Sequence, residues 1–166
     1  MKGTKNIALL VILGLIVIMG FWGCNGYNGL VKEDENVKKT LNNVNTEYQK
    51  RLDLVDNLVN TVKGAANFEK ETLTKLVEAR AKATSVNLNV DNLTPENIAK
   101  FQEVQGQMTG ALSRLLAVVE NYPDLKANQN FLQLQEELSD IENKLAASRR
   151  FFNAATTEYN NAVEAF

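Results

Sequence analysis

A run of 17 uncharged residues near the N-terminus, from Ile7 to Gly23, constrains this chain more than any other feature. It follows a short basic tail, residues 1–6, that carries Lys2 and Lys5. As a helix the run would be about 26 Å long, the lower limit for crossing the hydrocarbon core of a bilayer. We therefore predict a transmembrane signal anchor at residues 7–24. The side chains expected to contact membrane lipid include Ile7, Leu10, Leu13, Ile16, Phe21 and Trp22.

Cys24 leaves a second interpretation of this segment open. The apolar run is longer than that of most cleavable signal peptides and no Ala-x-Ala site follows it, which favours an uncleaved anchor. A basic tail, an apolar run and a cysteine also describe a bacterial lipoprotein signal, in which Cys24 would be the lipidated residue. That signal requires a small residue where Trp22 stands. Both interpretations tether the chain to a membrane.

The flanking charges give the expected orientation. Lys2 and Lys5 precede the apolar run, whereas Lys32, Lys38 and Lys39 follow it among acidic residues. A short basic tail usually stays in the cytoplasm, and a long domain crosses the membrane largely regardless of its charge. We therefore expect a single-pass protein whose N-terminus is inside and whose helical body lies outside the cytoplasm.

Composition argues against several classes of function. The 18 basic and 20 acidic residues give a net charge of −2, whereas nucleic-acid binders need a concentrated positive field. The chain has no histidine and one cysteine, so the commonest zinc ligands and the commonest general base are missing. We expect no metal, no cofactor and no nucleic-acid partner.

The remaining chain, residues 25–166, is expected to be a body of four helices. Apolar residues recur at helical spacing in four segments: Val37 to Val62, about Asn67 to Thr84, Pro95 to Asn121, and Phe131 to Phe166. Thr94 and Pro95 predict a helix start, and the segment 85–93 is expected to be a loop. The prediction is an all-α fold: an N-terminal transmembrane helix followed by an elongated antiparallel four-helix bundle.

Two surfaces favour self-association. In the last segment, successive positions of the apolar face are separated alternately by three and four residues without a break. This spacing is typical of a coiled coil. The first body helix has an apolar arc wider than one neighbour requires, and tethering to one membrane raises the local concentration of copies. We predict a homo-oligomer of parallel, side-by-side bundles, although a four-helix body can absorb part of this surface. That arc comprises Leu52, Leu54, Val55, Leu58, Val59 and Val62.

Arg51 is the most informative polar residue. Its position falls between Tyr48 and Val55 on the apolar side of its helix, where a guanidinium must reach water or a carboxylate. Glu137 and Glu142 on the last helix are the candidate partners in a buried ion pair. On the opposite face of the same helix, Asp53, Asn57 and Asn60 form a candidate interaction face, or simply a solvated surface.

Several separate motifs of this sequence resemble the LemA family of bacterial membrane proteins. They are YNGLV at 27–31, YQKR at 48–51, DLVDNLVNTVKG at 53–64, ARAKA at 79–83 and the block from Ala111 to Tyr159. The resemblance implies a single-pass membrane protein with a helical-bundle body and no assigned catalytic activity. The sequence departs from the family at Leu41, Asp56, Ala65 and Phe68, where relatives usually carry tryptophan, proline, tyrosine and histidine.

We therefore expect a non-enzymatic, membrane-anchored scaffold or interaction protein with an unknown protein partner. The alternative is a lipoprotein that is acylated at Cys24 and binds a solute or peptide. An enzyme that works through carboxylates alone ranks last, because no acidic pair has a recognisable site around it.

Overall fold

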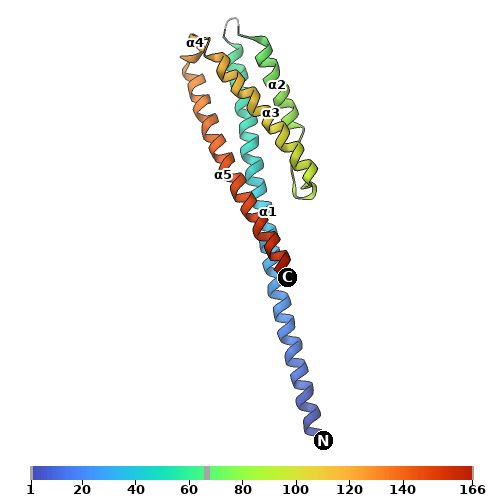
Figure 1. Ribbon diagram of the computed structural model, residues 1–166. Coiled ribbons are helices and arrows are strands. Elements are labelled where there is room, and N and C mark those ends of the chain that lie inside the picture. The colour runs from blue at the N-terminus through green and yellow to red at the C-terminus, as the bar shows by residue number, and fades with distance from the viewer. Residues whose placement is uncertain (1, 66–67, 166) are drawn as a thin grey trace. The chain divides into compact units, whose positions relative to one another are not determined.

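The computed structural model describes residues 2–65 and 68–165, except for the side chains of residues 2–11 and 21–25. Every regular element in this part of the chain is a helix, and it contains no strand, so the predicted all-α class is confirmed (Figure 1). The elements are α1 (Lys2–Lys63), α2 (Lys70–Thr84), the 3-10 turn η1 (Val90–Asn92), α3 (Pro95–Val119), α4 (Pro123–Lys126) and α5 (Gln129–Ala165).

The chain divides into two compact units. Unit 1 comprises Met1–Lys39 and Asn153–Phe166, and unit 2 comprises Thr40–Phe152. Unit 2 contains the second half of α1, then α2, α3 and most of α5, which alternate in direction along the bundle (Figure 1). One apolar core joins these four helices, and its most deeply buried members include Val55, Leu76, Leu115 and Leu145.

α1 is a single helix of 62 residues, where two separate segments were expected. The intervening residues 25–36 contain no proline, and a helix tolerates the glycine at position 29, whose surroundings are open. The helix ends at Lys63, and the N–H of Gly64 bonds to the Thr61 carbonyl, which places the helix end where Gly64 predicted a break.

Side-chain caps fix the starts of α3 and α5. The Thr94 hydroxyl accepts a hydrogen bond from the Asn97 N–H at 3.2 Å, with Pro95 in the first turn, as the sequence predicted. The Asn128 carboxamide oxygen accepts from the N–H groups of Asn130 and Phe131, at 3.0 and 3.2 Å. These caps set the points at which the third and last long helices enter the core.

The segment 85–93 contains no strand, in agreement with the prediction, but it is more than a surface loop. Leu88 is buried in the core of unit 2, and its carbonyl accepts a hydrogen bond from the Asn45 side chain at 2.7 Å. Asn89 and Asn92 close the turn by exchanging hydrogen bonds between side chain and backbone. The connection is thereby packed against α1.

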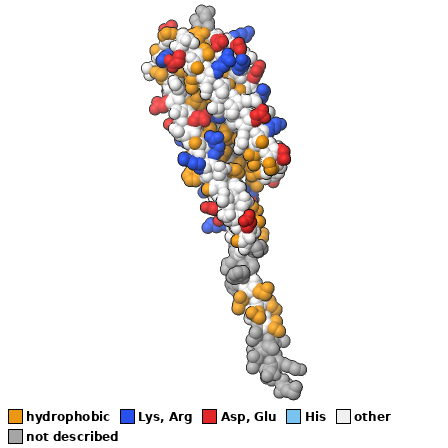
Figure 2. All heavy atoms as spheres, in the orientation of Figure 1, with side chains coloured by type: hydrophobic (Ala, Val, Ile, Leu, Met, Phe, Trp, Pro, Cys, Tyr) orange, Lys and Arg blue, Asp and Glu red, His pale blue; other side chains and the backbone are white. Residues whose placement is uncertain are grey.

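Unit 1 pairs the first part of α1 with the C-terminal end of α5. Val37 and Ala155 are the buried apolar residues of this unit. In contrast, seven apolar side chains between Ile12 and Met19 are 51% to 73% exposed, and Figure 2 shows them as a hydrophobic stretch of helix. Consecutive exposed positions of this kind point in all directions around a helix.

Part of the predicted anchor falls outside the described side chains, namely Ile7, Leu10, Phe21, Trp22 and Cys24. Over the residues that the structure does describe, no helix presents an apolar stretch long enough to cross a membrane. Leu13 and Ile16 are described, and both are exposed.

Candidate functional site

Arg51 is the centre of a polar cluster in the core of unit 2. The residue is 2% exposed, because the helical spacing of α1 places it among the buried apolar positions. Its Nη2 donates to the Thr109 hydroxyl at 2.7 Å and its Nη1 donates to the Gln105 carboxamide oxygen at 3.3 Å. The Thr109 hydroxyl in turn donates to the Gln105 carbonyl at 3.0 Å. The cluster therefore ties α1 to α3.

The third contact of Arg51 reaches α5. Its Nε lies 2.8 Å from Oε1 of Glu142, whose side chain is 39% exposed. The Nε–H is not aligned for a hydrogen bond, so the contact is an ion pair by charge and distance. Of the two carboxylates considered from the sequence, Glu142 makes this contact. Glu137 is exposed and accepts a hydrogen bond from Gln133 at 3.0 Å.

Burial governs the electrostatics of the cluster. Desolvation lowers the pKa of Arg51 from its usual value, and the charge of Glu142 opposes this shift. Desolvation raises the pKa of Tyr48, opposed by the nearby guanidinium groups of Arg149 and Arg51. The Tyr48 ring packs edge to face against Phe101, with 4.8 Å between the ring centroids.

Gln105 and Thr109 are the partners that sequence reasoning missed. Gln105 lies next to Val104 and occupies the same buried face of α3 as Phe101, Met108 and Leu112. That spacing was readable from the sequence and could have identified it. The predicted partners of Arg51 were carboxylates alone, whereas a guanidinium has five donors and neutral oxygens accept from two of its nitrogens here.

The cluster is suited to joining helices. It contains a cation, a carboxylate, an amide and a hydroxyl, but no general base next to a nucleophile, as hydrolytic or transfer chemistry would require. Among the described residues, no group of three or more acidic or thiol side chains could hold a metal ion. The cluster is thus best described as the polar centre of the bundle.

The predicted interaction face on α1 lies at the surface of unit 2. Asp53, Asn57 and Asn60 are all exposed, and Asp53 accepts a hydrogen bond from Gln49 at 2.9 Å. The neighbouring Asp56 accepts from Arg80 of α2, whose Nε also donates to the Leu52 carbonyl at 3.4 Å. Asp56, one of the departures from the family pattern, therefore joins α1 to α2.

The wide apolar arc of α1 presents no exposed surface to a second copy of the chain. All six of its residues are buried inside unit 2, because α2, α3 and α5 pack around this part of α1. The arc is therefore not an exposed surface, and the homo-oligomer stays a prediction. Any contact between copies must use another surface.

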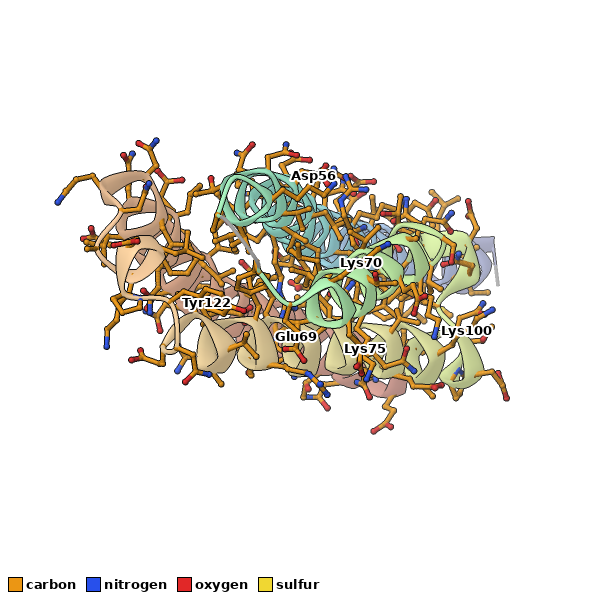
Figure 3. The ribbon with its side chains drawn as sticks, turned by 90° about the horizontal axis from the view of Figure 1, so that it is seen from above. Asp56, Glu69, Lys70, Lys75, Lys100 and Tyr122 are labelled. Carbon is orange, nitrogen blue, oxygen red and sulfur yellow. The ribbon has the colours of Figure 1, made fainter. Side chains whose placement is uncertain are left out.

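Two hollows lie on the surface of unit 2 beside α2. One, of about 490 Å³, is lined by Phe68, Leu73 and Val77 together with Lys63 and Lys70. The other, of about 340 Å³, runs between α2 and α3 and is lined by residues of both helices. Figure 3 shows Lys70 at the start of α2 and Lys75 on the side of α2 that faces α3.

The sequence is similar to known bacterial proteins. The sequence model of the LemA family matches residues 40–166. The chain is 27% identical to Protein LemA of Metamycoplasma hominis over 139 aligned residues. The alignment covers 84% of this chain and 60% of that protein. It is 25% identical to the magnetosome protein MamQ of Magnetospirillum gryphiswaldense over 154 aligned residues. This alignment covers 82% of this chain and 57% of that protein. The chain thus spans about three fifths of the length of these curated relatives.

Proposed function

Because this chain belongs to the LemA family, we propose that it is a non-enzymatic helical protein that is anchored in the bacterial cell membrane and acts as a scaffold or interaction module. Residues 7–24 are the single-pass anchor, and the helical body of residues 25–166 lies outside the cytoplasm. The family indicated by the sequence motifs is confirmed over residues 40–166.

The observation that carries the proposal is the exposed apolar stretch of α1. Seven large apolar side chains between Ile12 and Met19 have no partner in the described chain that would shield them from solvent. At about 25 cal/mol per Å² of apolar surface, leaving such a stretch in water is strongly unfavourable, and lipid removes this penalty. It adjoins further apolar positions from Ile7 to Gly23, which lengthens it to the span of a bilayer core.

The body supports an interaction role over a catalytic one. In its polar centre, Arg51 is held by Thr109 and by the carboxylate of Glu142, so these side chains are engaged in contacts between helices. Its surface carries basic and acidic side chains in close alternation, as Figure 2 shows for one face. Such a surface suits contacts with other proteins, which depend on complementary charges.

Extraction of bacterial membranes with alkaline carbonate tests the anchor. We expect the full chain to stay in the membrane pellet. Leu13→Arg combined with Ile16→Arg should release it, because each cation near the centre of a bilayer costs about 3 kcal/mol. The matched control is Val77→Arg combined with Leu132→Arg, which changes two exposed apolar residues of the body and should not release the chain. Release of the unmodified chain would contradict the proposal.

Intact-mass measurement separates the anchor from the lipoprotein alternative. The proposal expects the mass of the unprocessed chain in the membrane fraction. A mass that begins at Cys24 and includes acyl chains would replace the transmembrane anchor by a lipid anchor. The helical body would then bind a solute or peptide as a tethered lipoprotein.

A further inference from the structure

The groove between α2 and α3 combines a floor of small residues with a cationic rim. Ala79 of α2 and Gly110 and Ala111 of α3 form the floor of this hollow of about 340 Å³. Lys75, Lys82 and Arg114 line its sides. Small side chains permit the close approach of another helix, whose own side chains would fill the hollow.

The cations of this groove are incompletely neutralised within the chain. Lys75 and Arg114 share one carboxylate, that of Glu71, at 2.5 and 3.7 Å. Lys82 donates only to the neutral Gln107, at 3.5 Å. Glu78 is the one acidic side chain in the lining. The lining itself therefore carries three cations and one carboxylate, with the carboxylates of Glu71 and Glu103 beside it, and its cations favour an acidic partner.

The outer face of α5 has the complementary character. Glu136, Asp140 and Asn143 are exposed and project away from the buried side chains of Leu138 and Ile141. Glu136 and Asp140 make no ion pair within the described part of the chain. No lysine or arginine occurs between Gln129 and Asn143, and the exposed Lys144 follows Asp140 by one helical turn. This face therefore presents unpaired negative charge.

The two surfaces lie toward the same end of unit 2. α2 and α5 run in the same direction from the same end of the bundle, where Phe68 and Tyr122 pack with their ring centroids 4.8 Å apart (Figure 1). Lys75 and Lys82 are then about 8 and 18 Å from the start of α2, and Glu136 and Asp140 are about 11 and 17 Å from the start of α5. The charges of the groove and of the face therefore lie in the first turns of two helices that start at the same end of the bundle.

We infer that the α2–α3 groove binds the outer face of α5 of a second copy of this chain. Within unit 2, α2 and α5 lie on opposite sides of α1, so the contact joins different faces of neighbouring molecules (Figure 1). Such a head-to-tail contact extends into a row or closes into a ring. Copies anchored in one membrane share their direction and have a raised local concentration, which favours contact between the two surfaces. The inference rests on the proposed membrane anchor, and it identifies a second copy of this chain as a partner of the scaffold.

Disulfide crosslinking between two distinguishable copies tests the contact directly. One tagged copy carries Gln107→Cys in the groove, and a second copy with a different tag carries Asn143→Cys beside Asp140. Both changes keep the charges of the two surfaces, and Cys24 is present in every variant and control. We expect dimers between the two tags when the copies share a membrane. Dimers of like positions in equal yield, or no dimers above the background set by the unmodified chain, would overturn the inference.

Exchanging charges between the two surfaces tests whether Lys82 of one copy pairs with Asp140 of the other. Lys82→Glu in the groove copy should lower the yield of mixed dimers several-fold, and Asp140→Lys in the other copy should restore it. Restoration excludes simple misfolding of the Lys82→Glu chain. Lys100→Glu, an exposed change on α3 outside the groove lining, is the matched control and should leave the yield unchanged. Failure of Asp140→Lys to restore the yield would contradict the pairing of these charges.

The glycines of α3 provide a steric test. A Cβ at Gly106 or at Gly110 meets no atom within 4 Å, so open space adjoins both positions. Gly110 lines the groove and Gly106 does not. We expect Gly110→Leu to lower the mixed-dimer yield several-fold and Gly106→Leu to leave it unchanged, whereas equal effects would overturn the inference.

Yields are measured in both the carbonate-washed pellet and the supernatant. Release from the pellet contradicts the anchor, and retention without mixed dimers contradicts the contact alone.

Discussion

The guanidinium Nε of Arg51 lies 2.8 Å from Oε1 of Glu142, although the arginine side chain is 3% exposed and the glutamate side chain is 39% exposed. The ion pair therefore joins the interior of unit 2 to its surface, and it connects α1 to α5. Since the same guanidinium donates to Gln105 and Thr109 of α3, one side chain connects three helices.

Removing the charge of Glu142 should show how much the ion pair with Arg51 contributes to the stability of the fold. We expect Glu142→Gln to lower the free energy of unfolding by about 1–3 kcal/mol, because it leaves a buried cation without its carboxylate; the partial exposure of Glu142 limits the loss. Urea unfolding of the full chain in mild detergent provides the measurement.

The matched control for Glu142→Gln is Glu137→Gln, which alters an exposed carboxylate of the same helix and should change stability by less than about 0.5 kcal/mol. In an Arg51→Met background, Glu142→Gln should have a similarly small effect, because the buried charge is already gone. Equal losses from Glu142→Gln in both backgrounds would show that the ion pair contributes nothing.

Tyr48 gives a pH dependence in the alkaline range. Burial raises the pKa of its phenol above the ordinary value of about 10, so the folded chain holds this proton at pH values at which the unfolded chain has lost it. Its contribution to stability is therefore complete below pH 10 and declines as the pH rises from there toward the folded pKa. We expect Tyr48→Phe to flatten this decline in urea midpoints measured between pH 8 and 11. An unchanged slope would contradict the assignment.

The core of unit 2 should respond to the loss of one large side chain. Leu115 is 0% exposed, and we expect Leu115→Ala to destabilise the chain by about 2–5 kcal/mol through lost burial and the cavity left behind. Leu132→Ala is the matched change at a leucine that is 43% exposed, and it should have less than half that effect. Similar losses for the two variants would mean that the described core does not govern stability.

The cap of α3 gives a smaller and more local prediction. Thr94→Ala removes the acceptor of the Asn97 N–H and should destabilise the chain by about 1 kcal/mol. Thr157→Ala, on an exposed position within α5, is the control and should change stability little, because that hydroxyl bonds only to the Asn153 carbonyl in its own helix. Thermal unfolding followed by circular dichroism distinguishes the two.

The long helices were predictable from the sequence because each carries a continuous apolar face. The start of α3 at Pro95 was predictable as well, since a hydroxyl cap and a proline act through the local chain alone. α4 was missed because a single turn from Pro123 to Lys126 is too short to show any periodicity. Pro123 occupies the first position of this turn, which suits a residue without a backbone N–H.

The buried contacts of the connections were less predictable. Leu88 lies in a segment with no regular element of its own, and its burial depends on the approach of α1. The position of Arg51 in the core followed from its spacing, but its neutral partners on α3 are 54 and 58 residues away in the chain. Such contacts depend on how the helices pack, which the pattern of one helix does not specify.

The most direct test of a membrane anchor that holds the body outside the cytoplasm is protease accessibility in bacterial spheroplasts. A membrane-impermeant protease is added to intact spheroplasts that contain the full chain, and the fragments are followed with antibodies to the body. We predict digestion of the body before the membrane is permeabilised, with a short fragment containing residues 7–24 left in the membrane. Digestion of the body only after permeabilisation would show that it lies inside the cytoplasm and would contradict this topology.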